Sequence, residues 1–150
     1  MLINVLVGFI IPWIFGIYLF KLKPNILLTI FPIGTVLSHI INSLATEYKL
    51  WYISPEKFAA IDYLLFDIGL YTILPSYLIF FIQKYSRINK YFFILLFTII
   101  TTISEFIWLK AGRVSYDNNW TIYHTFFSYL IPYILVYMYY KLLKKKGVIV

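Results

Sequence analysis

The chain of 150 residues is 62% hydrophobic and only 13% charged, about half of the roughly 25% charge that soluble domains carry. The net charge is +7, and the basic residues lie at the ends of apolar runs rather than in one patch, which argues against a nucleic-acid partner. The lack of cysteine excludes disulfides, thiol catalysis and thiolate metal sites. No polar or low-complexity stretch is long enough to be a linker, so residues 1–150 are expected to form a single domain.

Five apolar runs have about the 20 residues that a helix needs to cross the hydrocarbon core of a bilayer. They predict membrane-spanning helices at residues 2–20, 25–44, 61–82, 91–109 and 121–140. The first run lacks the basic start and the small-residue cleavage site of a signal peptide, so we expect it to remain as a span. The sequence therefore predicts an all-α fold, a polytopic transmembrane bundle of about five helices.

Basic residues are divided unequally between the two ends of the predicted helices. One end carries nine of the 13 lysines and arginines: Lys21, Lys23, Lys84, Arg87, Lys90, Lys141, Lys144, Lys145 and Lys146. The opposite end carries Lys49, Lys57, Lys110 and Arg113. Because basic loops stay in the cytoplasm, this bias predicts a cytoplasmic C-terminus and, with five spans, an N-terminus outside.

Four of the predicted spans contain an internal proline, at Pro12, Pro32, Pro75 and Pro132. Each proline is nine residues from a lysine at the basic end, which places it about 13 Å along the helix and near the midplane of the bilayer. Proline bends a helix and frees a backbone carbonyl. The common depth predicts outer halves that splay around a cavity; the alternative is that the matched depth is coincidence.

The acidic residues and histidines all fall in the outer half of this predicted topology. Four of them lie inside spans, roughly 6–9 Å below the outer boundary: His39, Asp67, Glu105 and His124. The other carboxylates, Asp62 included, are interpreted as solvated loop charges. Ionisable groups inside a membrane normally face the bundle interior and pair with one another, so these four side chains are expected to meet in one outward-facing pocket.

Polar neighbours at helical spacing extend the pattern. Asn42 shares a face with His39, Tyr71 with Asp67, and Ser128 with His124. Glu105 and Asp67 are the candidate general bases. The candidate ligand-binding residues are His39, Asn42, Tyr71, His124, Ser128, and, from a loop that could cap the pocket, Tyr116 and Trp120.

Two other interpretations of this polar group stay open. Buried Asp–His or Glu–His pairs could simply tie helices together. Two histidines and two carboxylates could also bind zinc or manganese, but no HExxH-type spacing is present, so no metal site is assigned. No phosphate-binding or dinucleotide motif occurs either, and the cofactor is unknown.

The segment from residue 104 to 129, SEFIWLKAGRVSYDNNWTIYHTFFSY, carries a resemblance. Its pattern is Glu105-x2-Trp108 followed by Gly112, Tyr116, Trp120 and Ser128, with His124 standing where an aromatic residue is expected. It is similar to the C-terminal signature of a family of small membrane proteins from endospore-forming Bacillus- and Clostridium-type bacteria, a family without an assigned activity. The resemblance implies a multi-pass topology and a bacterial cytoplasmic membrane, and it implies no substrate.

Three functions are compatible with these patterns. The first is a protein that binds or senses a small ligand or lipid in the outward-facing polar pocket. The second is a membrane-embedded enzyme that uses Glu105 or Asp67 as a general base on a lipid or other amphiphile. The third is a transporter of a neutral solute; ion-coupled transport is disfavoured, because no helix interior carries Asp, Glu, His, Lys or Arg below the prolines. The oligomeric state is not indicated.

Overall fold

The computed structural model describes residues 1–149, and within them it holds five helical segments long and apolar enough to span a membrane. These segments are Leu2–Leu22, Pro24–Glu47, Glu56–Lys84, Lys90–Lys110 and Ile122–Lys145. The prediction of five such helices is confirmed. Every predicted run falls inside one of them, except that Thr121 precedes the last helix as its N-cap.

The first span is composite. Helix α1 (Leu2–Val5) leads into a π-helical turn, η1 (Leu6–Ile10), and then into α2 (Ile11–Leu22). Pro12 is the second residue of α2, directly after the π-helical turn, and its missing N–H cannot bond a carbonyl of that turn. The bend predicted at this proline therefore takes the form of a π-helical turn, one of the usual causes of a local helix distortion.

The third span is broken at Gly69 and not at Pro75, where the sequence predicted its bend. It contains a short 3-10 turn η2 (Glu56–Phe58), helix α4 (Ala59–Ile68) and helix α5 (Leu70–Lys84). Gly69 has φ −115° and ψ −98°, outside the helical region, whereas Pro75 lies within α5. A Cβ at position 69 would stand 2.0 Å from the carbonyl oxygen of Gly8. Glycine is thus required where α4 crosses the first span.

Side chains satisfy the backbone groups that this break exposes. The Oγ1 of Thr72 donates to the carbonyl of Asp67 over 2.7 Å. The indole N–H of Trp13, from α2, donates to the carbonyl of Ile68 over 3.0 Å. A helix end inside a membrane needs such donors because no water is present to replace them. The break therefore fixes Asp67 at the end of α4, next to the neighbouring helices.

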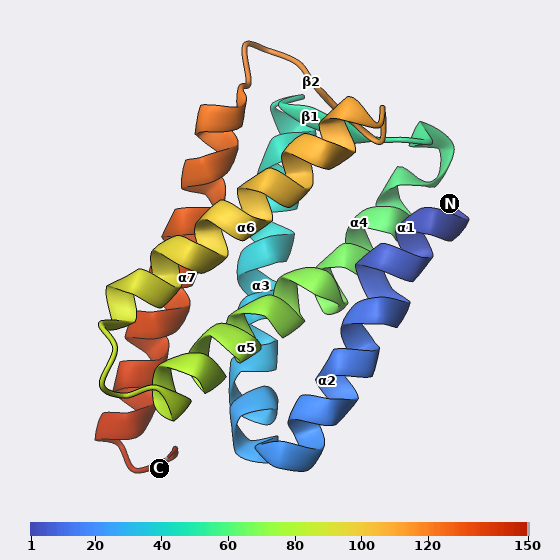
Figure 1. Cartoon of the computed structure of the whole chain (residues 1–150). Coiled ribbons are helices and arrows are strands. Elements are labelled where there is room, and N and C mark those ends of the chain that lie inside the picture. The colour runs from blue at the N-terminus through green and yellow to red at the C-terminus, as the bar shows by residue number, and fades with distance from the viewer. Residues whose placement is uncertain (150) are drawn as a thin grey trace.

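The remaining spans are single helices: α3 (Pro24–Glu47), α6 (Lys90–Lys110) and α7 (Ile122–Lys145). Helix α3 packs mainly on α5, and α6 runs beside α7 (Figure 1). The termini lie at opposite ends of the bundle (Figure 1). The turn after α2, the loop after α5 and the C-terminus are at one end, called here the basic end after the lysines and arginines it carries.

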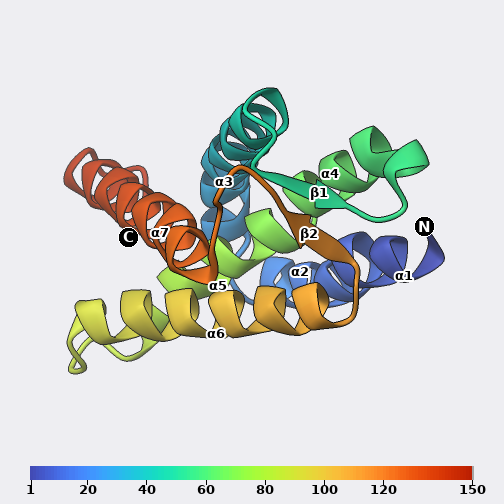
Figure 2. The same cartoon turned by 90° about the horizontal axis from the view of Figure 1, so that it is seen from above.

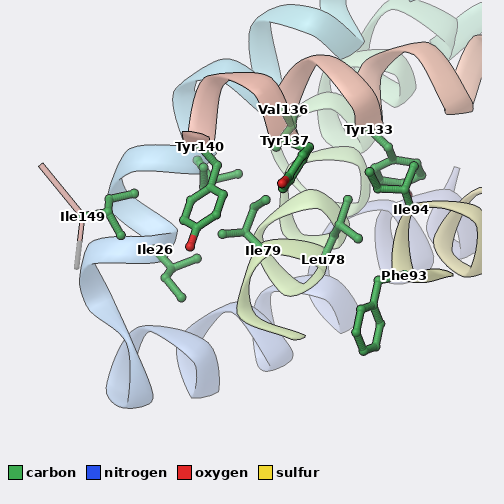
Figure 3. Packing of buried hydrophobic residues seen from close by; sticks show 11 residues of the cluster. Ile26, Leu78, Ile79, Phe93, Ile94, Tyr133, Val136, Tyr137, Tyr140 and Ile149 are labelled. Carbon is green, nitrogen blue, oxygen red and sulfur yellow. The ribbon is translucent and has the colours of Figure 1, made fainter. Parts of the chain in front are cut away.

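Aliphatic and aromatic side chains fill the half of the bundle nearer the basic end. Leu78 and Ile79 of α5 are fully buried there, in one cluster with Ile26 of α3 and Val136 of α7 (Figure 3). Ile30 of α3 belongs to the same cluster. The cluster continues through the buried residues Phe93, Ile94, Tyr133, Tyr137, Tyr140 and Ile149. Helices α3, α5, α6 and α7 are packed together in this half, and the polar side chains gather in the other half.

A small antiparallel sheet at the opposite end departs from the all-α prediction. Strand β1 (Trp51–Ile53) follows α3, and strand β2 (Val114–Tyr116) follows α6. Trp51 pairs with Tyr116 and Ile53 with Val114. These strands, called here the β ribbon, lie across one end of the bundle (Figure 2). Three-residue strands from two distant loops show no alternating pattern in the sequence, so the pairing was not predicted.

Candidate functional site: a carboxylate surrounded by hydroxyls

Glu105, near the C-terminal end of α6, is the centre of a group of hydroxyls. The Tyr116 hydroxyl donates to its Oε1 over 2.7 Å, and Thr125 Oγ1 donates to the same oxygen over 3.2 Å. The Tyr129 hydroxyl donates to Oε2. Tyr116 comes from the β ribbon, while Thr125 and Tyr129 are one turn apart on α7. Three consecutive elements of the chain, α6, β2 and α7, thus converge on one carboxylate.

Thr125 connects this group to the β ribbon a second time. It is almost completely buried. Its Oγ1 lies 2.8 Å from the Tyr116 hydroxyl and accepts the indole N–H of Trp120 over 2.9 Å. The ring of Trp120 lies 4.9 Å from that of Trp51 on β1. The aromatic residues of the ribbon are therefore held directly above Glu105 by hydrogen bonds and ring packing.

Burial raises the pKa of the Tyr116 phenol above its ordinary value of 10.0, and the nearby charge of Glu105 raises it further. A phenol with a raised pKa keeps its proton over the whole neutral range. Tyr116 is therefore a permanent hydrogen-bond donor to Glu105 at physiological pH. This tie between strand β2 and helix α6 does not depend on small changes in pH.

A cavity called here the Glu105 pocket lies between α3, α5 and α7, with Trp51 at its ribbon end. It is lined by Gly34, Leu37, Ser38, Ile41, Asn42, Trp51, Tyr71, Pro75, Glu105, Ser128, Tyr129, Pro132, Tyr133 and Val136. Its volume is about 60 Å³, room for roughly four waters at the 10–15 Å³ that one water needs on this measure. In this state the pocket can hold waters or one slender group, and a larger ligand requires the walls to part.

A second cavity of about 40 Å³ lies on another side of Glu105, against the first span and the β ribbon. Asn4, Trp108 and Arg113 line it, together with Tyr71 and Tyr129. Glu105 and these two tyrosines also line the Glu105 pocket. The tyrosine hydroxyls are 3.0 Å apart. Glu105 and the tyrosine pair therefore form a shared wall between the two cavities.

Asp67 is the centre of a separate hydrogen-bonded group. It is 1% exposed, and its Oδ1 accepts hydrogen bonds from Ser38 and, over 2.6 Å, from Asn42. Its Oδ2 lies 3.1 Å from Nδ1 of His39. The His39 side chain is 66% exposed, and its Nε2 has no hydrogen-bond partner among residues 1–149. The buried carboxylate thus orients a histidine on the outside of the bundle.

The two carboxylates do not contact each other. Glu105 lines the Glu105 pocket, whereas Asp67 does not. Ser38 and Asn42, which donate hydrogen bonds to Asp67, do line it. Of the other candidates from the sequence, Tyr71 and Ser128 also line the pocket. Tyr116 and Trp120 lie at its ribbon end through their bonds to Glu105 and Thr125.

His124 is not in the pocket. It is exposed in the first turn of α7, where its Nδ1 accepts the backbone N–H of Thr121 over 3.1 Å in a capping box. The next residue, Thr125, takes the inward position that the sequence analysis gave to His124. Counting residues from the end of a span could not resolve a shift of one position, which turns a side chain by about 100° around a helix.

Asp62 was interpreted as a loop charge, and this was wrong. It is completely buried in α4. Its Oδ2 accepts a hydrogen bond from Asn4 over 2.7 Å, and the same amide donates to the carbonyl of Ser54 over 3.0 Å. The available signal was Asn4 itself, a polar side chain near the start of an otherwise apolar run, which needs a partner in a membrane.

Among residues 1–149, no three histidine, aspartate or glutamate side chains come together as a metal site. No protein-family model matches the chain, and no curated protein or solved structure matches it either. The five long apolar helices give it the build of a multi-pass membrane protein. What it does is argued below from the two carboxylate groups and the cavities beside them.

Proposed function

We propose that this chain is a multi-pass protein of a bacterial cytoplasmic membrane that binds a small ligand or a lipid in the Glu105 pocket. The proposal rests on the lack of a cationic partner for Glu105 among residues 1–149. Its carboxylate accepts three hydroxyl hydrogen bonds, and no lysine, arginine or histidine of residues 1–149 forms an ion pair with it. A half-buried carboxylate without a cation favours a ligand that supplies one. The expected ligand therefore carries an ammonium or a similar donor on an apolar body.

The proposed orientation has the β ribbon outside and the basic end in the cytoplasm. It rests on the excess of lysine and arginine at the basic end. The Glu105 pocket then opens in the outer half of the membrane. The apolar cluster of α3, α5, α6 and α7 underlies it, which weighs against a solute path through the bundle. The resemblance to membrane proteins of endospore-forming bacteria supports the same location.

The β ribbon is the proposed cover of the pocket. A two-stranded sheet is marginally stable on its own, so a modest ligand-binding energy suffices to displace it. A ligand would replace the waters that fit the pocket, with its cationic group at Glu105 and its apolar part against Leu37, Ile41 and Val136. Entry from the outer leaflet, beneath Trp51, would let an amphiphile keep its chains in lipid.

The test is a binding titration on the full chain in detergent, followed by tryptophan fluorescence, because Trp51 lines the pocket. The probes are short-chain phosphatidylethanolamine, which carries an ammonium, and phosphatidylglycerol of equal chain length. The amine lipid should change the fluorescence at lower concentration, and Glu105→Gln should weaken its binding at least tenfold. Glu47→Gln, at an exposed carboxylate, is the matched control. Equal responses to both lipids, or an unaffected E105Q variant, would contradict the proposal.

A membrane-embedded enzyme is the second candidate, and the His39–Asp67 pair is the observation that favours it. A buried carboxylate that fixes Nδ1 of a histidine leaves Nε2 free to take a proton from a substrate, as in many general bases. His39→Gln and Asp67→Asn should then both abolish turnover of a lipid substrate while E105Q only weakens binding. Turnover that survives H39Q would remove this candidate.

A further inference from the structure

A hollow at the basic end, far from the Glu105 pocket, collects positive charge. It lies between the loop that joins α5 to α6 and the last turns of α7, and its volume is about 650 Å³. We call this hollow the basic groove, because four basic side chains line it: Arg87, Lys90, Lys141 and Lys144. Two come from the loop end and two from α7. The size falls within the roughly 300–1,000 Å³ of ligand pockets.

No acidic side chain of residues 1–149 balances the charges of the basic groove. None of the six acidic residues lines it. The one ion pair among residues 1–149 joins His39 to Asp67, in the polar half of the bundle. Four cations held around one hollow repel each other, so the fold places them together at a cost that a bound anion would offset.

Aromatic and apolar side chains form the rest of the groove. The ammonium of Lys90 lies 5.7 Å from the ring centre of Tyr137, which positions it by a cation–π contact. Ile88, between Arg87 and Lys90 in the loop, also lines the hollow and is 47% exposed. Cationic groups thus stand beside apolar surface at the end of a span, the combination met by a phospholipid where its headgroup joins its chains.

We propose that the basic groove binds the phosphate headgroup of an anionic phospholipid. The guanidinium of Arg87 suits a bidentate contact to a phosphate, and the lysines act as point charges around it. Basic pockets between spans at the cytoplasmic face are known to hold such headgroups. Four cations match a lipid with two phosphates better than one with a single phosphate, so diphosphatidylglycerol is the preferred occupant. The lipid would hold the α5–α6 loop to α7.

The experiment compares lipids and soluble phosphates on the full chain purified in detergent. Native mass spectrometry and thermal unfolding are recorded with diphosphatidylglycerol, phosphatidylglycerol, phosphatidylcholine, glycerol phosphate and inorganic phosphate. The expected result is a retained anionic lipid and a raised Tm with diphosphatidylglycerol, a smaller rise with phosphatidylglycerol, and none with phosphatidylcholine. An equal rise with inorganic phosphate would overturn the lipid assignment in favour of a small-anion site.

A matched pair of triple variants separates the groove from general surface charge. Arg87→Gln/Lys141→Gln/Lys144→Gln removes three groove cations, and Lys23→Gln/Lys145→Gln/Lys146→Gln removes three at the same end but outside the groove. The first should weaken diphosphatidylglycerol binding at least tenfold, and the second by less than threefold. Equal losses would overturn the proposal. Should the first variant fail to fold, a photo-crosslinker at Ser86, which lines the groove, should label diphosphatidylglycerol and not phosphatidylcholine; the reverse result would also overturn it.

Discussion

The hydroxyl of Tyr116 lies 2.7 Å from Oε1 of Glu105, and this one hydrogen bond joins the β ribbon to the wall of the Glu105 pocket. The Tyr116 hydroxyl also lies 2.8 Å from Oγ1 of Thr125. The β ribbon, Glu105 and Thr125 are therefore a single hydrogen-bonded unit. Whatever displaces Glu105 from its hydroxyl partners also loosens the cover.

Tyr116→Phe should destabilise the protein by about 1–3 kcal/mol, because it removes a donor from a half-buried carboxylate and keeps the ring. The measurement is thermal unfolding in detergent. Tyr123→Phe removes a hydroxyl from a residue that is 77% exposed and should leave the Tm unchanged. If both variants melt like the wild type, Tyr116 does not hold the ribbon to Glu105.

Tyr116 also predicts a dependence of stability on alkaline pH. Because its pKa is raised in the folded protein, the folded state holds the phenolic proton more tightly than the unfolded chain does. The resulting stability is fully present below the ordinary pKa of 10.0 and is lost as pH rises above it. The Tm of Tyr116→Phe should therefore fall less steeply above pH 10 than that of the wild type. Identical slopes would show that the phenol is not shielded in the folded protein.

Asp67→Asn should lower stability by about 1–3 kcal/mol, because an amide N–H would face the donors Ser38 or Asn42 in a buried position. Asp117→Asn, at an exposed loop residue, is the matched control and should have little effect. Chemical unfolding in mixed micelles gives both values. A D67N variant as stable as the wild type would contradict a stabilising role for the hydrogen bonds from Ser38 and Asn42.

Gly69→Ala should be strongly destabilising, by about 3 kcal/mol or more. The added Cβ would meet the Gly8 carbonyl oxygen at 2.0 Å and the Leu65 carbonyl oxygen at 2.8 Å, both backbone atoms that cannot turn away. Gly34→Ala meets its nearest neighbour, Pro75, at 3.2 Å and should cost much less. Yields and melting temperatures of the two variants make the comparison. Equal behaviour would contradict the close crossing of α4 and the first span.

The orientation can be tested with single cysteines, since the chain has none of its own. Ser115→Cys, at an exposed position of strand β2, should react with a water-soluble maleimide added from outside. Ser86→Cys, at the basic end, should react only after the cytoplasmic side is exposed. Ser76→Cys, at a fully buried position of α5, is the unreactive control. Labelling of Ser86→Cys from outside would reverse the proposed orientation.

The hydropathy pattern predicted the helices well, because a bilayer imposes a length and a composition on each span. Helical spacing also placed Asn42 beside His39, and both contact Asp67. Two features depended on contacts between distant parts of the chain and escaped prediction. The break at Gly69 is set by the approach of Gly8, and Asp62 is buried because Asn4 reaches it. The break at Gly69 has no local sequence signal, and for Asp62 the one signal was the polar side chain of Asn4 near the start of an apolar run.

The pairing of Trp51 with Tyr116 has a consequence for how the protein is made. Strand β1 leaves the ribosome long before β2, with α4, α5 and α6 still to be synthesised. During that interval Trp51 and the ladder groups of β1 have no partner, and Glu105 does not yet exist to receive a hydroxyl. Even when β2 arrives, Glu105 gains Thr125 and Tyr129 only with α7. Completion of the pocket is therefore one of the last steps of biogenesis, and a chain that stops before residue 121 can insert its first four spans but cannot form the site.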